Sequence, residues 1–376
     1  MATTIADIAR SLETWAPPGT AESWDKIGLH VGDPSRDVTT ALIGLDMTPQ
    51  LLEEAKTLGA ELILTHHPLL LKPVSFITPA SQTGYLALRL AEARIALYCI
   101  HTNLDSARDG VSFALGEQLG LENIRFLGSL ESGLIKLAVF VPESHAEAVR
   151  TALAEAGAGR IGNYDTCSFS IPGSGTFRPL EGSNPTIGRA KGKMETVSEL
   201  RIEVEVARWN VSAVLKALFS AHPYDEVVYD IFPVEQPNRA AGFGAIGELP
   251  EPESLQAFLG RVSSAVNNPA LRYAGDLEAP VRKVAVCGGA GTPFIRFAMR
   301  EKADVFVTSD LSHHRFFEVL DNEGQPIMAL VDAGHYETER FTEDLLRAHL
   351  LNAFPDVDWH VTCTRTSAGK TFVHPA

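Results

Sequence analysis

Short apolar runs alternate with helix-forming stretches through the first third of the chain. The runs Ala41–Asp46, Glu61–Thr65 and Ile95–Ile100 are typical of buried strands. Helices are predicted at residues 49–59, 82–94 and 111–121. Because continuous apolar strands bounded by helices are typical of a parallel sheet with both faces buried, we predict an α/β fold with a parallel-sheet core.

The same alternation returns after Gly247. Strands are predicted at residues 283–287, 304–308, 327–332 and 359–364, and helices at 293–302, 314–320 and 338–354. The simplest account is one discontinuous α/β core domain, built from residues 1–127 and 246–376. An insertion is tolerated where the two ends of a loop lie close together.

Residues 128–245 differ in character from both flanks. Strands are predicted at residues 134–141, 167–171, 200–206 and 227–232, and helices at 144–156 and 211–221. A stretch rich in Gly, Ser and Pro at residues 172–193 predicts a long loop. Two successive β-α-β units predict an inserted α+β domain with a ferredoxin-like fold.

The length of 376 residues, 45% of them hydrophobic, allows two folding units with full cores. No apolar run approaches the roughly 20 residues that span a bilayer. The N-terminus lacks the basic region and long apolar stretch of a signal peptide. It predicts instead a helix capped by Thr3 or Thr4, with Ile5, Ile8 and Leu12 on one side. We therefore expect a cytoplasmic protein that does not enter the membrane.

The formal net charge is −15. Such an acidic surface repels phosphate backbones, so we expect no nucleic-acid partner, although a small anionic substrate can still bind in a pocket that holds metal. The four cysteines are far apart and form no CxxC pair. Buried, reduced thiols are therefore expected rather than a disulfide framework or a zinc knuckle.

Metal-binding residue types follow three of the predicted strands directly. His66 and His67 follow the run 61–65, His101 and Asp105 follow 95–100, and His335 and Glu339 follow 327–332. Ligands gather beyond the carboxyl ends of the strands of a parallel sheet. If the three segments converge, they bring three imidazoles and two carboxylates to one place.

Each segment alone has another explanation. Adjacent histidines on a regular strand point to opposite faces, so His66 and His67 can share a site only if Pro68 breaks the strand. Asp105 can cap the following helix. His335 and Glu339 have the i, i+4 spacing of one helix face, which also suits an exposed ion pair. The shared position at one sheet edge favours a metal site.

A mixed histidine and carboxylate set suits Zn, Mn or Fe better than Ca. Adjacent histidines suit two divalent ions better than one, because each imidazole can bind its own ion. Paired sites of this kind activate water and stabilise charged transition states.

Other polar residues are weaker candidates. His101 can orient the metal ligands or transfer protons, or it can be a buried, hydrogen-bonded histidine. Asp310 and His314 follow the strand 304–308 and can contact substrate or orient the ligands; helix capping and a solvated face are the alternatives. Gly289 and Gly291 can offer free N–H groups to a phosphate, or they can form a plain turn.

Four segments together resemble the Ngg-interacting-factor-three-like family, whose members are also known as GTP cyclohydrolase I type 2 homologues. They are Ser23–Leu29 (SWDKIGL), Thr65–Pro68 (THHP), His101–Asp105 (HTNLD) and Gly334–Glu339 (GHYETE). The resemblance covers essentially the whole chain and matches the long form of the family. Lys26 departs from it, since the family often has Asn there.

The resemblance implies metal ligation by five residues, with the carboxylates bridging: His66, His67, Asp105, His335 and Glu339. It also implies a toroidal homohexamer and an inserted domain similar to PII and CutA proteins. We expect a metal-dependent hydrolase acting on a small, nucleotide-like substrate. The alternative is a non-catalytic, metal-binding or ligand-sensing scaffold. The absence of a clearly assignable general acid or substrate clamp favours this alternative.

Overall fold

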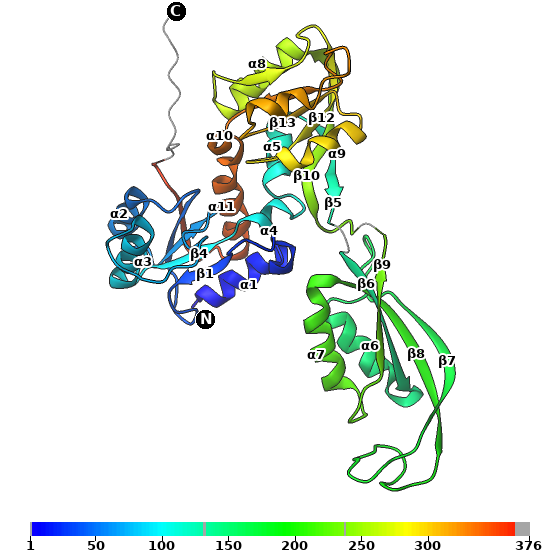
Figure 1. The fold of residues 1–376 in the computed structure, drawn as a ribbon. Helices are drawn as coiled ribbons and strands as arrows, with labels where there is room; N and C mark the ends of the chain where they lie inside the picture. The colour runs from blue at the N-terminus through cyan, green and yellow to red at the C-terminus, as the bar shows by residue number, and fades with distance from the viewer. Residues whose placement is uncertain (1, 131–132, 237, 365–376) are drawn as a thin grey trace, which may run out of the picture. The chain divides into compact units, whose positions relative to one another are not determined.

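The computed structural model describes residues 2–130, 133–236 and 238–364. Its contacts divide the chain into two compact units. The first combines the chain up to Gly128 with the chain from Ala241 onward, and the second is Ser129–Ala240. Figure 1 shows the second unit in green. In the sequence, this unit lies between the two segments of the first unit.

The first unit contains a five-stranded sheet made mainly by the N-terminal segment. Its order is β1 (Gly28–Val31), β4 (Ala96–Cys99), β3 (Leu62–Thr65), β2 (Thr40–Gly44) and β15 (Asp358–Val361). The last four strands are parallel, and β1 pairs antiparallel with β4 at the edge. The helices of this region are α1 (Ile5–Trp15), α2 (Pro49–Leu58) and α3 (Gln82–Ala93).

A second sheet of six strands lies in the same unit. Its order is β11 (Arg272–Ala274), β14 (Ala329–Asp332), β13 (Val305–Thr308), β12 (Pro280–Val286), β10 (Gly242–Ser254) and β5 (Glu122–Ser129). The strands β12, β13 and β14 are parallel to one another; β10 pairs antiparallel with β12, and β11 pairs antiparallel with β14. Its helices include α8 (Leu255–Val266) and α9 (Ile295–Arg300).

The prediction of an α/β fold is confirmed, but the prediction of one parallel sheet is wrong. The first unit has two mixed sheets, and four strands were not predicted: β1, β5, β10 and β11. Three of these strands lie at sheet edges, and β1, β5 and β11 are largely half-buried or exposed, so their sequences lack the continuous apolar run of a central strand.

Two helices join the cores of the two sheets. In α5 (Val111–Gln118), Val111 packs in the core of the first sheet, whereas Phe113 and Leu115 pack in that of the second. In α11 (Phe341–Ala353), Leu346 and Leu350 belong to the first core, and Phe341 packs against the second. The two sheets of the first unit therefore share two helices whose side chains pack in both cores.

The first helix forms as its sequence predicts. Thr4 caps α1 by accepting from the Asp7 N–H, and the Asp7 side chain accepts in return from the Thr4 N–H. Ile5, Ile8 and Leu12 are buried in the first core. Among the described residues, no helix has the length and apolarity needed to cross a membrane.

The second unit has the order β6-α6-β7-β8-α7-β9. The bounds are β6 (Leu134–Pro142), α6 (Ala146–Glu155), β7 (Ser168–Phe177), β8 (Glu195–Ala207), α7 (Val211–Ala221) and β9 (Tyr229–Val234). The strands lie in the order β7-β8-β6-β9 with antiparallel neighbours, the ferredoxin-like topology. The predicted loop at 172–193 is partly wrong, because β7 continues to Phe177; its Pro172 is tolerated since β7 is an edge strand.

Replacing Leu350 by Ala is expected to destabilise the first unit by about 2–5 kcal/mol, because Leu350 is fully buried in the core that α11 shares with the first sheet. Leu351 is the matched control on the same helix; it is exposed, so Leu351→Ala should change the free energy of unfolding by less than about 0.5 kcal/mol. Urea titration followed by tryptophan fluorescence measures both, and equal effects would contradict the assignment.

Candidate metal centre

The His66–His67 pair follows the last residue of β3. The two imidazole rings lie 5.1 Å apart at 46°, so they do not point to opposite faces as they would on a continuing strand. The strand ends at Thr65, and the His67 N–H donates to the Leu45 carbonyl. This break before Pro68 allows both imidazoles to face one site.

The other ligand candidates come from two short helices. Asp105 is the last residue of α4 (Thr102–Asp105), which follows β4 and His101. His335 and Glu339 are the first and last residues of α10 (His335–Glu339), which follows β14. Because β3 and β4 belong to the five-stranded sheet and β14 to the six-stranded sheet, the predicted single sheet edge is corrected to the carboxyl ends of two sheets.

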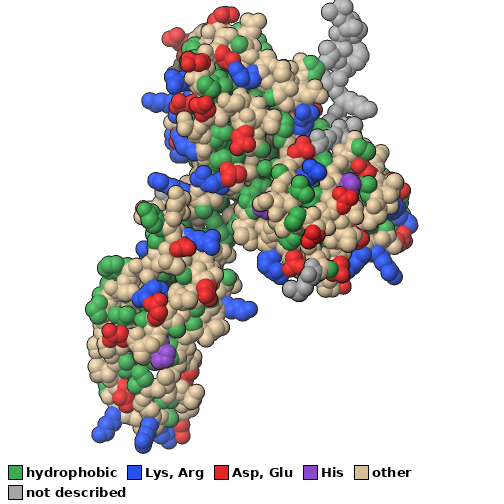
Figure 2. Space-filling view, turned by 180° about the vertical axis from the view of Figure 1, so that it is seen from behind, with side chains coloured by type: hydrophobic (Ala, Val, Ile, Leu, Met, Phe, Trp, Pro, Cys, Tyr) green, Lys and Arg blue, Asp and Glu red, His purple; other side chains and the backbone are tan. Residues whose placement is uncertain are grey.

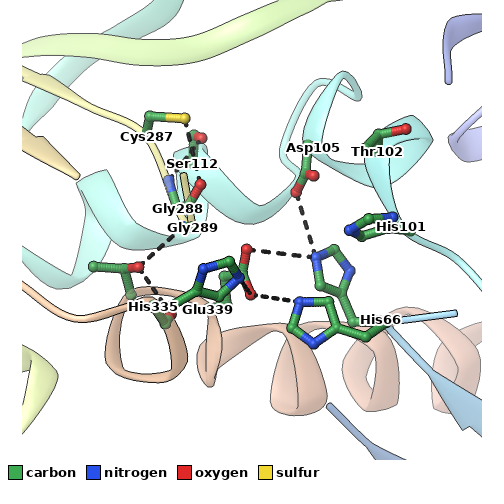
Figure 3. Close-up of polar contacts among 12 residues, drawn as sticks. His66, His101, Thr102, Asp105, Ser112, Cys287, Gly288, Gly289, His335 and Glu339 are labelled. Atoms are coloured by element: carbon green, nitrogen blue, oxygen red, sulfur yellow. Dashed lines mark hydrogen bonds and ion pairs between the residues drawn. The ribbon is translucent and has the colours of Figure 1, made fainter. Parts of the chain in front are cut away.

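The structure brings all five predicted ligands together around the Glu339 carboxylate. On one side, Glu339 Oε1 lies 3.9 Å from His66 Nε2, which lies 3.6 Å from Asp105 Oδ1. On the other, Glu339 Oε2 lies 3.0 Å from His67 Nε2 and 3.1 Å from His335 Nε2. Figure 3 shows Asp105 and Glu339 directed at the imidazoles. The two carboxylate oxygens therefore face two different pairs of side chains.

Each imidazole is held by its Nδ1 atom. His66 Nδ1 lies 2.9 Å from the Ile100 carbonyl, His67 Nδ1 lies 2.8 Å from Asp46 Oδ1, and His335 Nδ1 lies 2.7 Å from Asp310 Oδ2. Since these oxygens only accept, Nδ1 carries a proton in each ring, and Nε2 is the nitrogen that faces the cluster. This is the usual orientation of histidines that bind metal.

Two buried atoms of the cluster have no hydrogen-bond partner in the described part of the chain: His66 Nε2 and Asp105 Oδ1. Unpaired buried polar atoms cost free energy, and they rarely converge without a function. A divalent cation would satisfy both atoms. The donor set of imidazole nitrogens and carboxylate oxygens therefore fits a metal ion.

The electrostatics of the cluster also favour a cation. Burial lowers the pKa of His66 to about 3, which keeps its imidazole neutral. Burial, followed by the charge of Glu339, raises the pKa of Asp105 well above its usual range. Burial opposes ionisation of Glu339 as well, but His335 and His67 hold its pKa below the usual range. A divalent ion would relieve the repulsion between the two carboxylates.

His101 lies beside the cluster and is half-buried. Its ring centroid is 5.1 Å from that of His66 and 5.4 Å from that of His67, and the three rings also form a possible metal-binding group. His101 Nδ1 lies 2.9 Å from Asp25 Oδ1, so Nε2 is left to face the cluster. The position suits proton transfer as well as ligation.

The remaining candidates have different outcomes. Asp310 hydrogen bonds to His335 and thereby orients its imidazole. His314 is exposed in the 3-10 turn His313–Phe317, and no contact among the described residues joins it to the cluster. This short turn replaces the helix predicted at 314–320. Nearby, Asp332 at the end of β14 accepts from the Leu311 N–H and pairs with Arg272.

Gly289 and Gly291 do not offer free N–H groups. The Gly289 N–H donates to Thr338 Oγ1 and the Gly291 N–H donates to Thr308 Oγ1, so the structure does not support a phosphate cradle. Gly289 instead leaves space for the carboxylate: its φ is +62°, and a Cβ there would overlap Glu339 Oε1.

Two carboxylates at the centre were not predicted. Asp46 follows β2 at the same end of the sheet as His67, so the rule that identified the ligands could have identified it too. Asp25 comes from the loop before β1, and its buried carboxylate accepts hydrogen bonds from His101 and Thr102. No spacing in the sequence indicates this contact.

The fold and the cluster define an α/β protein with a candidate metal centre between two sheets. A family model described as Duf34/NIF3 (NGG1p interacting factor 3) matches residues 3–370, and the chain belongs to this family. The family resemblance inferred from the sequence is thereby confirmed.

Individual relatives match over most of their length. A Halalkalibacterium halodurans protein named "GTP cyclohydrolase 1 type 2 homolog" is 39% identical over 329 residues, which cover 87% of each chain. A Mycobacterium leprae protein of the same name is 39% identical over 357 residues, covering 93% of this chain and 91% of its own. The crystal structure of a Bacillus cereus protein related to NIF3 has a TM-score of 0.80 at 35% identity, and the match covers 99% of this chain and 100% of that one.

Gly289→Ala is expected to weaken metal binding about 10- to 100-fold, because the added methyl group displaces the Glu339 carboxylate. Gly324→Ala is the matched control: its φ is +78°, but a Cβ there meets nothing within 4 Å. Isothermal titration with Mn²⁺ measures the affinity of both variants. Wild-type affinity in Gly289→Ala would contradict the role assigned to this glycine.

Metal affinity is expected to rise with pH. Burial favours the neutral form of His67, but Asp46 and Glu339 outweigh it and raise the pKa of His67 to about 10. Glu339 likewise raises the pKa of His335 to about 9, although burial acts to lower it. Both imidazoles are thus protonated at pH 7 and must lose about two protons when Nε2 binds metal. The affinity should increase from pH 6 and level off near pH 10. Calorimetry in buffers of different ionisation enthalpy counts the protons; pH-independent binding without proton release would refute this.

Proposed function

We propose that the chain is a dinuclear, metal-dependent hydrolase of a small, nucleotide-like substrate. The observation that carries the proposal is the Glu339 carboxylate, whose two oxygens face two separate sets of ligand atoms. The relatives named GTP cyclohydrolase 1 type 2 homolog support a purine nucleotide as the substrate class.

In this proposal, Glu339 would help to hold both ions. His66 and Asp105, which lie near Oε1, would hold one ion, and His67 and His335, which lie near Oε2, would hold the other. The mixed nitrogen and oxygen ligands favour Zn, Fe or Mn. Asp46 and Asp310 hold two of the imidazoles in the ligating orientation.

When bound, a pair of divalent ions lowers the pKa of water and stabilises negative charge on a reacting carbon or phosphorus centre. The protein supplies proton transfer and positioning. His101 Nε2 takes a proton during the attack of water and returns it to the leaving group, while Asp25 fixes the ring through Nδ1. The buried His66 keeps one wall of the site dry.

Metal-loaded protein is expected to hydrolyse GTP or a member of a phosphoester panel, and His67→Ala is expected to lower kcat at least about 100-fold through loss of a ligand. His145→Ala is the control, since His145 is an exposed residue of the second unit, where its ring contacts Ser144. Product analysis by liquid chromatography gives the rates. Equal rates in wild type and His67→Ala would contradict the proposal.

A non-catalytic, ligand-sensing scaffold is the second candidate. A cavity of about 800 Å³ in the second unit favours it, with walls that include Phe140, Ile171, Phe177, Tyr224 and Val228. Its size suits a small ligand. The ferredoxin-like topology supports a PII/CutA-like regulatory role for this unit. Tight ligand binding by a protein that turns over no substrate would favour the scaffold over the hydrolase.

We also propose a cytoplasmic homohexamer without nucleic-acid partners. The family resemblance supports this assembly. Large apolar side chains that remain exposed on the single chain are compatible with it: Phe76 is 79% exposed in the first unit and Phe169 is 65% exposed in the second. Figure 2 shows hydrophobic side chains between charged ones on one face of both units.

A further inference from the structure

Trp24 is the one tryptophan in the described residues that is mostly exposed. Its relative exposure is 53%, whereas Trp359 is buried and Trp15 and Trp209 are half-buried. The Trp24 ring meets the His101 ring edge-on, with centroids 5.9 Å apart and planes at 72°. A large indole surface therefore faces solvent one ring away from the candidate metal ligands.

The loop that carries Trp24 is held firmly by Asp25. The buried carboxylate accepts from His101 Nδ1 at 2.9 Å and from the Thr102 N–H and hydroxyl at 3.1 and 2.5 Å. The Glu22 N–H donates in turn to the Thr102 hydroxyl at 2.9 Å. These bonds fix both sides of Trp24 to the segment that follows β4, so the exposed ring has a defined position.

His101 links this ring to the metal centre. It contacts the rings of His66 and His67 on one side and Trp24 on the other. A small molecule whose heterocycle stacks on the indole is therefore long enough to reach Glu339 and the imidazoles around it. Indole faces bind flat heterocycles by stacking, and a ring that is fixed in advance loses little entropy when it does so.

We propose that Trp24 is the stacking platform for a planar heterocycle of the substrate, and that it selects purine-like molecules for the metal centre. The inference rests on the proposed function and specifies its substrate class. Trp24 positions the ring, and the residues around Glu339 act on the bound molecule. Stacking of this kind strengthens binding by about tenfold to a hundredfold.

The test compares two probes with the same sugar phosphate. Guanosine 5′-monophosphate and ribose 5-phosphate are titrated calorimetrically into the full chain, with and without Mn²⁺. Wild-type protein should bind the nucleotide at least about tenfold more tightly than the sugar phosphate. Trp24→Ala should abolish this preference and leave ribose 5-phosphate binding unchanged. Trp24→Phe should restore most of it, and Trp209→Ala, in the second unit, should retain all of it.

Three results would overturn the platform. The first is a wild-type protein without preference for the nucleotide, and the second is an unchanged preference in Trp24→Ala. The third is a Trp24→Ala variant in which only the mass measured by light scattering changes, which would make Trp24 a contact between copies of the chain. Failure of the hydrolase proposal is separate, because a Trp24-dependent preference without turnover leaves the platform intact and refutes only the hydrolysis.

Discussion

The burial of the Glu339 carboxylate is the constraint on which the site depends. The side chain is 4% exposed, and both oxygens face nitrogen atoms of imidazoles. A carboxylate in such a place costs several kcal/mol unless positive charge offsets it. Protonated His67 and His335 provide that charge. In the proposed holoprotein, divalent ions would take the place of these protons, so the geometry that stabilises the carboxylate would also suit divalent metal.

This constraint explains features at some distance from the carboxylate. Gly289 has no side chain because Glu339 occupies the space. Asp46, Asp310 and the Ile100 carbonyl each hold the Nδ1 atom of one imidazole, which turns Nε2 inward. The helices α5 and α11 pack in the cores of both sheets, so the candidate ligands that follow strands of either sheet can meet.

The sequence predicted the ligand-bearing strands well because central parallel strands carry continuous apolar runs. The histidines and carboxylates directly after those runs come together as the carboxyl-end rule predicts. The division into two sheets could not be predicted in the same way. It depends on edge strands such as β1 and β11, whose half-buried and exposed residues give no distinct pattern. It also depends on which of the two cores the apolar side of each helix packs against. Asp25 shows a similar limit, since its contact with His101 joins residues 76 positions apart and depends entirely on the folded loop.

The central claim is that three distant segments enclose a pair of metal ions around Glu339. Crystals of the protein loaded with Mn²⁺ or Zn²⁺ allow an anomalous difference map at the metal absorption edge. The account predicts two peaks per chain, roughly 3.5–4 Å apart, with the Glu339 carboxylate between them. A single peak away from Glu339, or none in a fully folded chain, would contradict it.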